Sequence, residues 1–380
     1  MINVNIIMSV YNGEEYLAAQ IDSILNSTVD NWRLFIFDDC STDSSFEIAN
    51  NYAKEHKHKI YAFKNHENMG STKSFLYNLS RVSEKNIHND KLKIVNSYVK
   101  RVPKKLTKRI VDTAISLKKT AVTFYRKPHL PSGKNRRYEY YMFADQDDFW
   151  LMDKIALTTK KMRKTEHRYG RHKPALVFTD AVLVDENLKF TDKSFFKTNH
   201  MKPKKKNLAH ILMENKCIGC TTMVNQAAAD LLRKTFPMDE NPVTEGENIN
   251  PAAEYDYVRY HDWWMAIICA AFGHIRYLDV PTIMYRQHQN NQVGQTSFME
   301  YVRRRVDEMQ NISKRLESTR RQALAFYRCY GSEMRKGKRR VLKNFIRLGS
   351  YGPIRKRVCI LRYGFFKSGF IRNAGLMLYI

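Results

Sequence analysis

Three carboxylates lie close together in the segment FADQDDFW, at residues 143–150. Asp145, Asp147 and Asp148 follow an apolar run, and a Phe-Trp pair comes directly after them. Acids at such short range repel one another unless a divalent cation lies between them, and such a cation also attracts a polyanionic ligand. The spacing therefore indicates a metal site. A structural alternative is that Asp147 or Asp148 serves only as the N-cap of a helix that begins near Lys154.

The elements around this cluster predict where the acids lie. Residues 140–144 are an apolar, aromatic run typical of a buried strand, so the acids follow the carboxyl end of a strand. Nearer the N-terminus, expected strands alternate with expected helices, the strands at 4–10, 33–37 and 60–63 and the helices at 14–25, 44–54 and from 68 onward. This alternation predicts an α/β fold with a doubly wound, mostly parallel sheet flanked by helices.

Polar residues also follow the first two expected strands. Ser9 and Tyr11 stand at the end of the first strand, and Asp39 stands at the end of the second. The carboxyl ends of parallel strands meet at one edge of a sheet, and ligands of open α/β sheets bind at that edge. We therefore expect these residues and the 145–148 acids to line one site.

The chain resembles the inverting glycosyltransferases of the large GT-A fold family 2, in the branch that includes bacterial rhamnosyltransferases. The resemblance covers about residues 2–295, is interrupted by residues 81–137, and is carried by seven motifs in the same order: SVYNGEEYLAAQIDSIL, FIFDDCSTD, NMGSTKSF, ADQDDFW, GCTTMVN, HDWW and YRQHQNNQVG. The last two motifs favour the rhamnosyltransferase branch.

This resemblance implies roles on the donor side. Ser9, Tyr11 and Asp39 match residues that bind the nucleoside of a sugar donor, with Asp39 at the pyrimidine base. Asp145 matches the acid near the ribose, and Asp147, in the DXD motif, matches the residue that holds Mn²⁺ or Mg²⁺ against the diphosphate. A diphosphate leaving group needs its charge neutralised, and a divalent ion held by one or two carboxylates suits that task.

The resemblance also implies a catalytic base and a closing segment. Asp262, in HDWW, matches the general base, while Arg286 and His288 match a segment that closes over the site and meets the diphosphate. Displacement at the anomeric carbon needs the acceptor hydroxyl deprotonated on the opposite face. A lone carboxylate among aromatic rings can have a raised pKa suited to that role. For His288, a ligand role and a structural role remain open.

Three further residues are candidates for the acceptor side: Trp263, Trp264 and Cys220. A tryptophan can stack on a sugar ring, but both indoles can also be core residues at the start of a buried helix with Asp262 as its N-terminal acid. Cys220 belongs to the GCT motif. The cysteines show no second pair near Cys217 and Cys220, which argues against zinc and favours a reducing compartment.

The positive charge is confined to two segments. The chain carries a net charge of +27, of which residues 81–137 contribute +14 and residues 301–380 contribute +17. The rest of the chain is slightly acidic, at −4. The cationic excess therefore lies outside the expected catalytic motifs, and it does not by itself indicate nucleic acid as a partner.

Both basic segments contain apolar residues at helical spacing. Residues 103–119 predict a cationic amphipathic helix. In the tail, the apolar residues that alternate with cations are Val341, Leu342, Phe345, Ile346 and Leu348, and then Phe365, Phe366, Phe370, Ile371, Leu376 and Met377. Aromatic and basic residues together fit the headgroup layer of an anionic bilayer. A solvated helical face and a nucleic-acid groove are the alternatives. No run reaches the ~20 apolar residues that span a bilayer, and no signal peptide is recognised.

These observations predict a GT-A glycosyltransferase domain at residues 1–300, interrupted by a basic insertion at 81–137, and a basic helical extension at 301–380 that associates with membranes. The expected activity is inverting, metal-dependent transfer of a sugar from a nucleotide-sugar donor to a lipid-linked glycan in bacterial surface polysaccharide synthesis. L-Rhamnose from dTDP is the first candidate, and a UDP-hexose or N-acetylhexosamine donor is the second. The expected location is cytoplasmic, on the inner face of the cell membrane. A non-catalytic basic adaptor for membrane or nucleic acid is the competing hypothesis.

Overall fold

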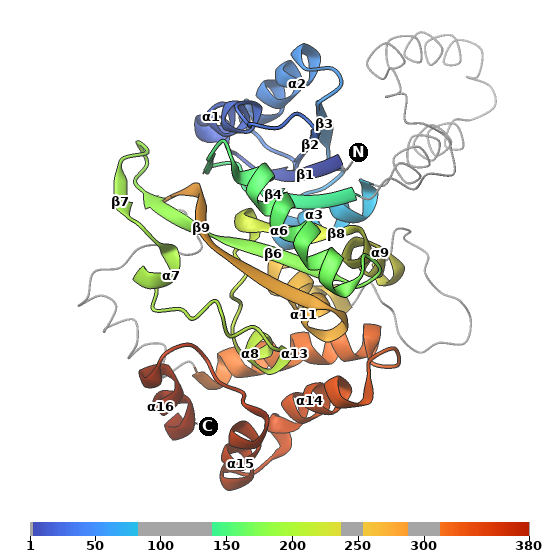
Figure 1. Cartoon of the computed structure of the whole chain (residues 1–380), viewed down its shortest axis with the longest axis vertical. Helices are drawn as coiled ribbons and strands as arrows, with labels where there is room; N and C mark the ends of the chain where they lie inside the picture. Colours follow the sequence, from blue (N-terminus) through green and yellow to red (C-terminus); the bar gives the residue numbers. More distant parts are fainter. Residues whose placement is uncertain (1–2, 83–138, 237–253, 288–311, 380) are drawn as a thin grey trace, which may run out of the picture. The chain divides into compact units, whose positions relative to one another are not determined.

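A mixed sheet forms the centre of the computed structural model, which describes residues 3–82, 139–236, 254–287 and 312–379 (Figure 1). Within these residues the sheet has nine strands, in the order β3-β2-β1-β4-β8-β6-β9-β5, with β7 paired to β6. The strands are β1 (Asn3–Val10), β2 (Trp32–Asp38), β3 (Ile60–Lys64), β4 (Glu139–Ala144), β5 (Phe149–Trp150), β6 (Ala175–Val184), β7 (Phe190–Asp192), β8 (Thr222–Asn225) and β9 (His274–Arg286).

The first half of the sheet is parallel. β1 pairs with β2 on one side and with β4 on the other, and β2 pairs with β3, all in parallel register. β8 runs antiparallel between β4 and β6, while β9 is again parallel to β6. Six strands therefore point the same way, and β5, β7 and β8 oppose them. The expected α/β fold with a mostly parallel sheet is confirmed, and the predicted strands and helices of the first 80 residues all form.

Helices cover the sheet, and the helices at the C-terminal end of the chain lie beyond it (Figure 1). α2 packs against β2 and β3, α6 against β6 and β9, and α11 against β6, β9, α8 and α9. The helices are α1 (Glu14–Leu25), α2 (Ser45–Glu55), α3 (Gly70–Arg81), α6 (Lys154–Tyr169), α7 (Phe195–Thr198), α8 (Leu208–Met213), α9 (Gln226–Thr235), α11 (His261–Phe272), α13 (Ile312–Tyr330), α14 (Lys336–Arg347), α15 (Pro353–Tyr363) and α16 (Phe370–Tyr379), with single 3-10 turns η2 (Gly219–Thr221), η3 (Tyr255–Tyr257) and η4 (Leu348–Ser350).

The buried strands explain why the sheet forms. β1 has the apolar sequence NVNIIMSV, and most of its side chains are buried because helices cover both faces of the parallel half. β4, EYYMFA, is buried in the same way. The carboxyl ends of β1, β2 and β4 then lie side by side, which brings their polar loops together.

The chain divides into two compact units, residues 1–80 with 138–380, and residues 81–137. The second unit is the expected basic insertion, and almost all of it lies outside the described residues. In the first unit, α13 and α14 pack against α8, so the C-terminal helices join the same unit as the sheet. Among the helices that the structure describes, none has the length and apolar character needed to cross a membrane.

Candidate active site

A cavity of about 1090 Å³ opens at the carboxyl ends of β1, β2 and β4. Segments far apart in the chain form its wall, among them α3, residues 145–147 and the start of α11. The residues expected from the sequence that line it are Ser9, Tyr11, Asp39, Asp145, Asp147 and Asp262. Six candidates separated by up to 253 positions thus share one cavity.

Asp39 is the centre of a hydrogen-bond network at one end of this cavity. Its carboxylate accepts hydrogen bonds from the Asn65 side chain at 2.8 Å and from the backbone N–H of Gly70 at 2.9 Å. The Ser9 hydroxyl donates to the Ser74 hydroxyl at 2.7 Å, and Ser74 also accepts from the Asn65 side chain. The strand ends and the start of α3 are therefore tied together around a buried carboxylate.

Gln146 joins the two loops that face each other across the cavity. Its side-chain oxygen accepts from the Tyr11 N–H at 2.7 Å, and its amide donates to the Tyr11 carbonyl at 3.0 Å. Gly13 leaves room for this arrangement, because a Cβ there would lie 2.4 Å from the Gln146 side chain. A side chain at position 13 would therefore have to displace the end of the Gln146 side chain.

The acid cluster spans the cavity wall and the core behind it. Asp145 and Asp147 line the cavity, whereas Asp148 is 1% exposed. One Asp148 oxygen accepts from the Arg286 N–H at 3.3 Å, and the other is buried without a hydrogen-bond partner among the described residues. The N-cap of α6 is Asp153, so capping that helix does not explain Asp147 or Asp148.

Burial and mutual repulsion disfavour the ionised form of two carboxyl groups in this cluster, Asp145 and Asp148. Burial, together with the charges on Asp147 and Asp262, raises the pKa of Asp145 to about 7. Burial and the charges on Asp147 and Asp145 also raise the pKa of Asp148 well above its usual range. A nearby cation would remove this repulsion, since an opposite charge favours the ionised carboxylates.

The donor set fits a divalent cation. Ligand atoms of Asp145, Asp148 and Cys220 all lie within 4.8 Å of one another. The buried, unpartnered Asp148 oxygen and the two carboxylates on the cavity wall supply the oxygen ligands that Mg²⁺ and Mn²⁺ prefer, while the thiol is a softer donor. Asp147, the metal ligand expected from the sequence, lines the same cavity but does not belong to this group, so its role as a ligand stays a prediction.

Lys154 lies buried behind the acids. Its ammonium donates to the Cys220 carbonyl at 2.8 Å and lies 4.6 Å from the centre of the Trp150 ring. Burial lowers its pKa to about 8, although the charges of Asp148 and Asp145 act in the opposite direction. The acid cluster thus has a cation within its own scaffold.

Asp262 lies in the first turn of α11, on the cavity wall. It accepts hydrogen bonds from the Asn215 side chain and from backbone N–H groups, among them that of Trp263 at 2.5 Å. Burial is the largest cause of a pKa raised to about 7. A carboxylate with such a pKa can take a proton near neutral pH.

Its neighbour His261 also lines the cavity. The ring stacks on Phe75 with centroids 4.1 Å apart, and its Nε2 has no hydrogen-bond partner among the described residues. Burial lowers the pKa of His261 to about 3, so the imidazole stays neutral at working pH.

The structure corrects the expected acceptor side. Trp263 is 4% exposed and donates its indole N–H to the Ile211 carbonyl, and Trp264 is fully buried against Phe326. Neither tryptophan lines the cavity, because both belong to the buried face of α11. Cys220 is also fully buried and does not line the cavity, and its thiol lies with the carboxylates of Asp145 and Asp148.

Arg286 is near the site but faces its supporting loops. Its guanidinium donates to the backbone carbonyls of Asp147 and Glu186 and lies 4.4 Å from the centre of the Tyr16 ring. It fixes the acid-bearing loop, and its contact with the donor diphosphate stays a prediction. His288 lies outside the described residues.

Sequence patterns missed four residues of this site: Gln146, Lys154, Asn215 and Tyr260. Tyr260 lines the cavity, is 37% exposed and stands two positions before Asp262 in the chain. Its position directly before HDWW was the available signal. Nothing in the local sequence marks Asn215 or Lys154, because their partners are distant in the chain.

Comparison with known sequences finds a family match in the N-terminal part of the chain. Residues 5–87 match the sequence model described as "Glycosyl transferase family 2", which confirms the resemblance to that family. The dTDP-rhamnosyl transferase RfbG of Shigella flexneri is 22% identical over 288 residues, or 76% of this chain and 73% of that protein. The putative glycosyltransferase EpsE of Bacillus subtilis (strain 168) is 38% identical over 80 residues, or 21% of this chain and 29% of EpsE. The chain thus matches less than a third of EpsE.

Among solved structures, the chain is similar to residues 1–349 of S. aureus TarS in complex with UDP. The TM-score is 0.45 at 13% sequence identity, and the match covers 93% of this chain and 73% of that one.

Proposed function

We propose that this chain, with its family 2 glycosyltransferase match at residues 5–87, is an inverting glycosyltransferase that uses a nucleotide-sugar donor. The observation that carries the proposal is the shared cavity. It brings the nucleoside-binding candidate Asp39, the carboxylates Asp145 and Asp147, and the candidate base Asp262 to one space. Such a space accommodates a donor and an acceptor between the charge-neutralising end and the proton-accepting end.

In the proposed reaction, Asp262 accepts the proton of the acceptor hydroxyl as that oxygen attacks the anomeric carbon. The new bond forms on the face opposite to the departing diphosphate, so the anomeric configuration inverts. The hydrogen bonds from Asn215 and the Trp263 N–H hold the carboxylate in one orientation. Burial keeps its pKa near neutrality, which suits a general base.

On the donor side, Asp147 and its neighbours Asp145 and Asp148 would hold Mn²⁺ or Mg²⁺. That ion supplies neutralisation of the diphosphate charge as the glycosidic bond breaks. The protein's own contribution is to hold Asp145 and Asp148 close together with Lys154 near them, and to fix the Asp147 backbone through Arg286.

For the sugar, we propose L-rhamnose from dTDP, transferred to a lipid-linked glycan of a bacterial surface polysaccharide. The similarity to RfbG, a dTDP-rhamnosyl transferase by its name, supports this donor. A UDP-hexose or a UDP-N-acetylhexosamine is the second candidate.

We further propose that the C-terminal helices bind an anionic membrane surface on its cytoplasmic side. Residues 334–380 contain 13 Lys and Arg and no Asp or Glu. α15 exposes an apolar stripe formed by Ile354, Val358 and Leu361, and α16 exposes Phe370 and Ile371. A lipid headgroup layer matches both the cations and the apolar stripe.

The exposed residues agree only in part with those expected for the tail, where Phe370 and Ile371 are exposed as expected. Of the apolar side chains predicted from the sequence, Leu342, Phe345, Leu348, Phe365 and Leu376 are buried. They pack the C-terminal helices onto each other and onto the rest of the unit. For example, the ring centroids of Phe345 and Phe365 lie 5.2 Å apart. The expected apolar tail residues did not include any from α15, and this helix adds the exposed stripe of Ile354, Val358 and Leu361.

A panel of nucleotide sugars tests the proposal. Each donor is incubated with the purified chain and Mn²⁺, and release of the nucleotide is measured with and without a lipid-linked acceptor. We expect one donor to be consumed, dTDP-L-rhamnose first, and we expect the Asp147→Ala variant to lose this activity. Donor binding that is independent of metal, without turnover of any donor, would instead support a non-catalytic membrane adaptor.

A further inference from the structure

The segment between α8 and η2 links the candidate base to the C-terminal end of the chain. Glu214 is the C-cap of α8, and Asn215 follows it directly. Asn215 lines the active-site cavity together with Lys216 and Gly219. These two adjacent residues have different partners. Asn215 contacts the candidate base Asp262, and Glu214 contacts residues of the C-terminal segment 367–373.

Asn215 is oriented by two hydrogen bonds. Its side-chain oxygen accepts from the N–H of Cys217 at 3.0 Å. The amide group is then left to donate, and it donates to the carboxylate of Asp262. Because the carbonyl and amide ends have distinct partners, the side chain has one satisfactory orientation.

Glu214 is held by the segment before and within α16. Its carboxylate accepts from the Ser368 hydroxyl at 2.5 Å, from the Ser368 N–H at 2.9 Å and from Arg372 at 2.5 Å. Lys216 adds an ion pair at 3.6 Å. The side chains of Glu214 and Arg372 are only 11% and 14% exposed, so solvent screens this pair weakly. We call these contacts the Glu214 clamp.

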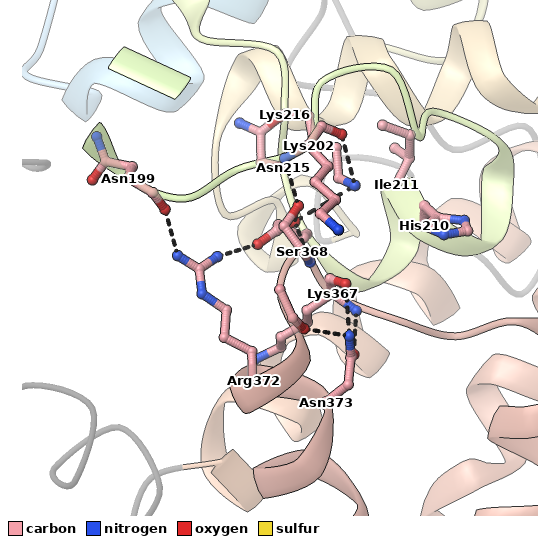
Figure 2. Close-up of polar contacts among 12 residues, drawn as sticks. Asn199, Lys202, His210, Ile211, Asn215, Lys216, Lys367, Ser368, Arg372 and Asn373 are labelled. Carbon is pink, nitrogen blue, oxygen red and sulfur yellow. Dashed lines mark hydrogen bonds and ion pairs between the residues drawn. The ribbon is translucent and has the colours of Figure 1, made fainter. Parts of the chain in front are cut away.

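The clamp is anchored on its tail side as well. The second guanidinium nitrogen of Arg372 donates to the Asn199 carbonyl at 2.8 Å, and the Lys202 N–H donates to the Ser368 hydroxyl at 2.9 Å. Figure 2 shows Ser368, Arg372 and Asn373 gathered beneath the loop that carries Asn215 and Lys216. Asn373 closes the turn before α16 through Lys367 and Gly369.

We propose that Asn215 is a positioning residue for the base Asp262, and that the Glu214 clamp lets the C-terminal segment 367–373 hold Asn215 in place. This inference rests on the proposed function, since it concerns the orientation of the catalytic carboxylate. It assigns the tail a role in turnover that is separate from membrane binding.

The physical reason is that a general base works only within a narrow geometry. A misplacement of about 1 Å at a reacting group can cost on the order of a hundredfold in rate. If Asn215 is replaced by alanine, the Asp262 carboxylate keeps its backbone N–H donors but loses the hydrogen bond from the Asn215 side chain. If the clamp opens, Asn215 loses the fixed neighbour that determines where its own backbone lies.

The first test compares Asn215→Ala with Arg372→Ala in steady-state transfer assays. We expect kcat to fall about ten- to a hundredfold for Asn215→Ala and less for Arg372→Ala, while the KM for the donor changes less than about twofold. Arg372→Lys should recover part of kcat, because lysine keeps the charge at Glu214 but not the second bond to Asn199. An unchanged kcat for Asn215→Ala overturns the proposal. A donor KM that changes by the same factor as kcat overturns it as well.

Arg357→Ala is the matched control for a general loosening of the tail. Arg357 ties α15 to α16, because its guanidinium donates to the carbonyls of Met377 and Leu378 rather than to Glu214. We expect this variant to keep wild-type kcat. If Arg357→Ala lowers kcat as much as Arg372→Ala, the effect is general destabilisation and the clamp has no specific role.

A double-mutant cycle tests whether the clamp acts through Asn215. The variant with both Asn215→Ala and Arg372→Ala should be no slower than Asn215→Ala alone, within about twofold, since one path carries both effects. Losses that multiply would overturn the coupling. Ser368→Ala is the milder replacement if Arg372→Ala does not fold, and the same cycle applies to it.

Hydrogen exchange gives a readout that needs no activity. We expect Arg372→Ala, and not Arg357→Ala, to speed amide exchange in residues 214–219. Unchanged exchange in that loop would refute the clamp. If instead no donor is turned over by the wild-type chain, the proposed function fails while the exchange result still reports on the clamp.

Discussion

Replacing Asp262 by asparagine is the most direct test of the proposed chemistry. The amide has nearly the shape of the carboxylate and can still accept from the Trp263 N–H, but it cannot take a proton from the acceptor. Loss of a general base usually costs about a hundred- to ten-thousandfold in rate. We therefore expect kcat for transfer to fall by at least about a hundredfold, with donor affinity nearly unchanged.

The pH profile of the wild-type chain supplies the second half of this test. Burial raises the pKa of Asp262 to about 7, and the base works only when it is ionised. Activity should therefore decline as the pH falls through 7. With a single titrating group, about half of the molecules are active at pH 7 and about one in eleven at pH 6, so the rate should drop roughly fivefold.

The assay follows nucleotide release in the presence of acceptor between pH 5.5 and 9. Asp256→Asn is the matched control, because Asp256 lies close to Asp262 in the chain, pairs with Lys73 at the surface and does not line the cavity. Wild-type turnover in Asp262→Asn, or a rate that is flat from pH 6 to 8, would refute Asp262 as the base.

Three further substitutions test the other parts of the proposal. Asp147→Ala should lower Mn²⁺-dependent donor turnover by about a hundredfold, as measured in a metal titration, and a metal response equal to wild type would contradict its role. Gly13→Ala should raise the donor KM, because the new Cβ would lie 2.4 Å from Gln146 and displace it from Tyr11; an unchanged KM in a donor titration would count against that support. Val358→Asp should weaken binding to anionic vesicles about tenfold in a sedimentation assay, whereas Phe190→Asp, on the exposed β7, should not; equal binding by both would remove α15 as the membrane face.

The sequence was sufficient for the site residues that follow strands. Ser9, Asp39 and Asp145 each stand at the carboxyl end of an apolar strand, and parallel pairing then forces them to one edge. The position of Asp262 needed more, since it depends on a helix packed from the second half of the chain. The family motifs supplied that link, and the cavity joins it to the others.

Side-chain direction was what the sequence could not predict. HDWW contains two indoles beside a carboxylate, but α11 is buried around most of its circumference, so both tryptophans enter the core. The tail shows the same limit, because periodicity reveals an apolar face without saying whether protein or lipid covers it. Asn215 and Lys154 were missed because their partners, Asp262 and Cys220, are 47 and 66 positions away.

The buried Lys154 has a consequence for the protein when no divalent ion is bound. A lysine ammonium fixed within the scaffold partly balances the aspartates even when no divalent ion is present. We therefore expect the loop that carries these aspartates to keep its conformation in the metal-depleted protein, because the lysine reduces the repulsion between their carboxylates. We therefore expect chelation to silence the enzyme without unfolding it, and fresh metal to restore the activity at once.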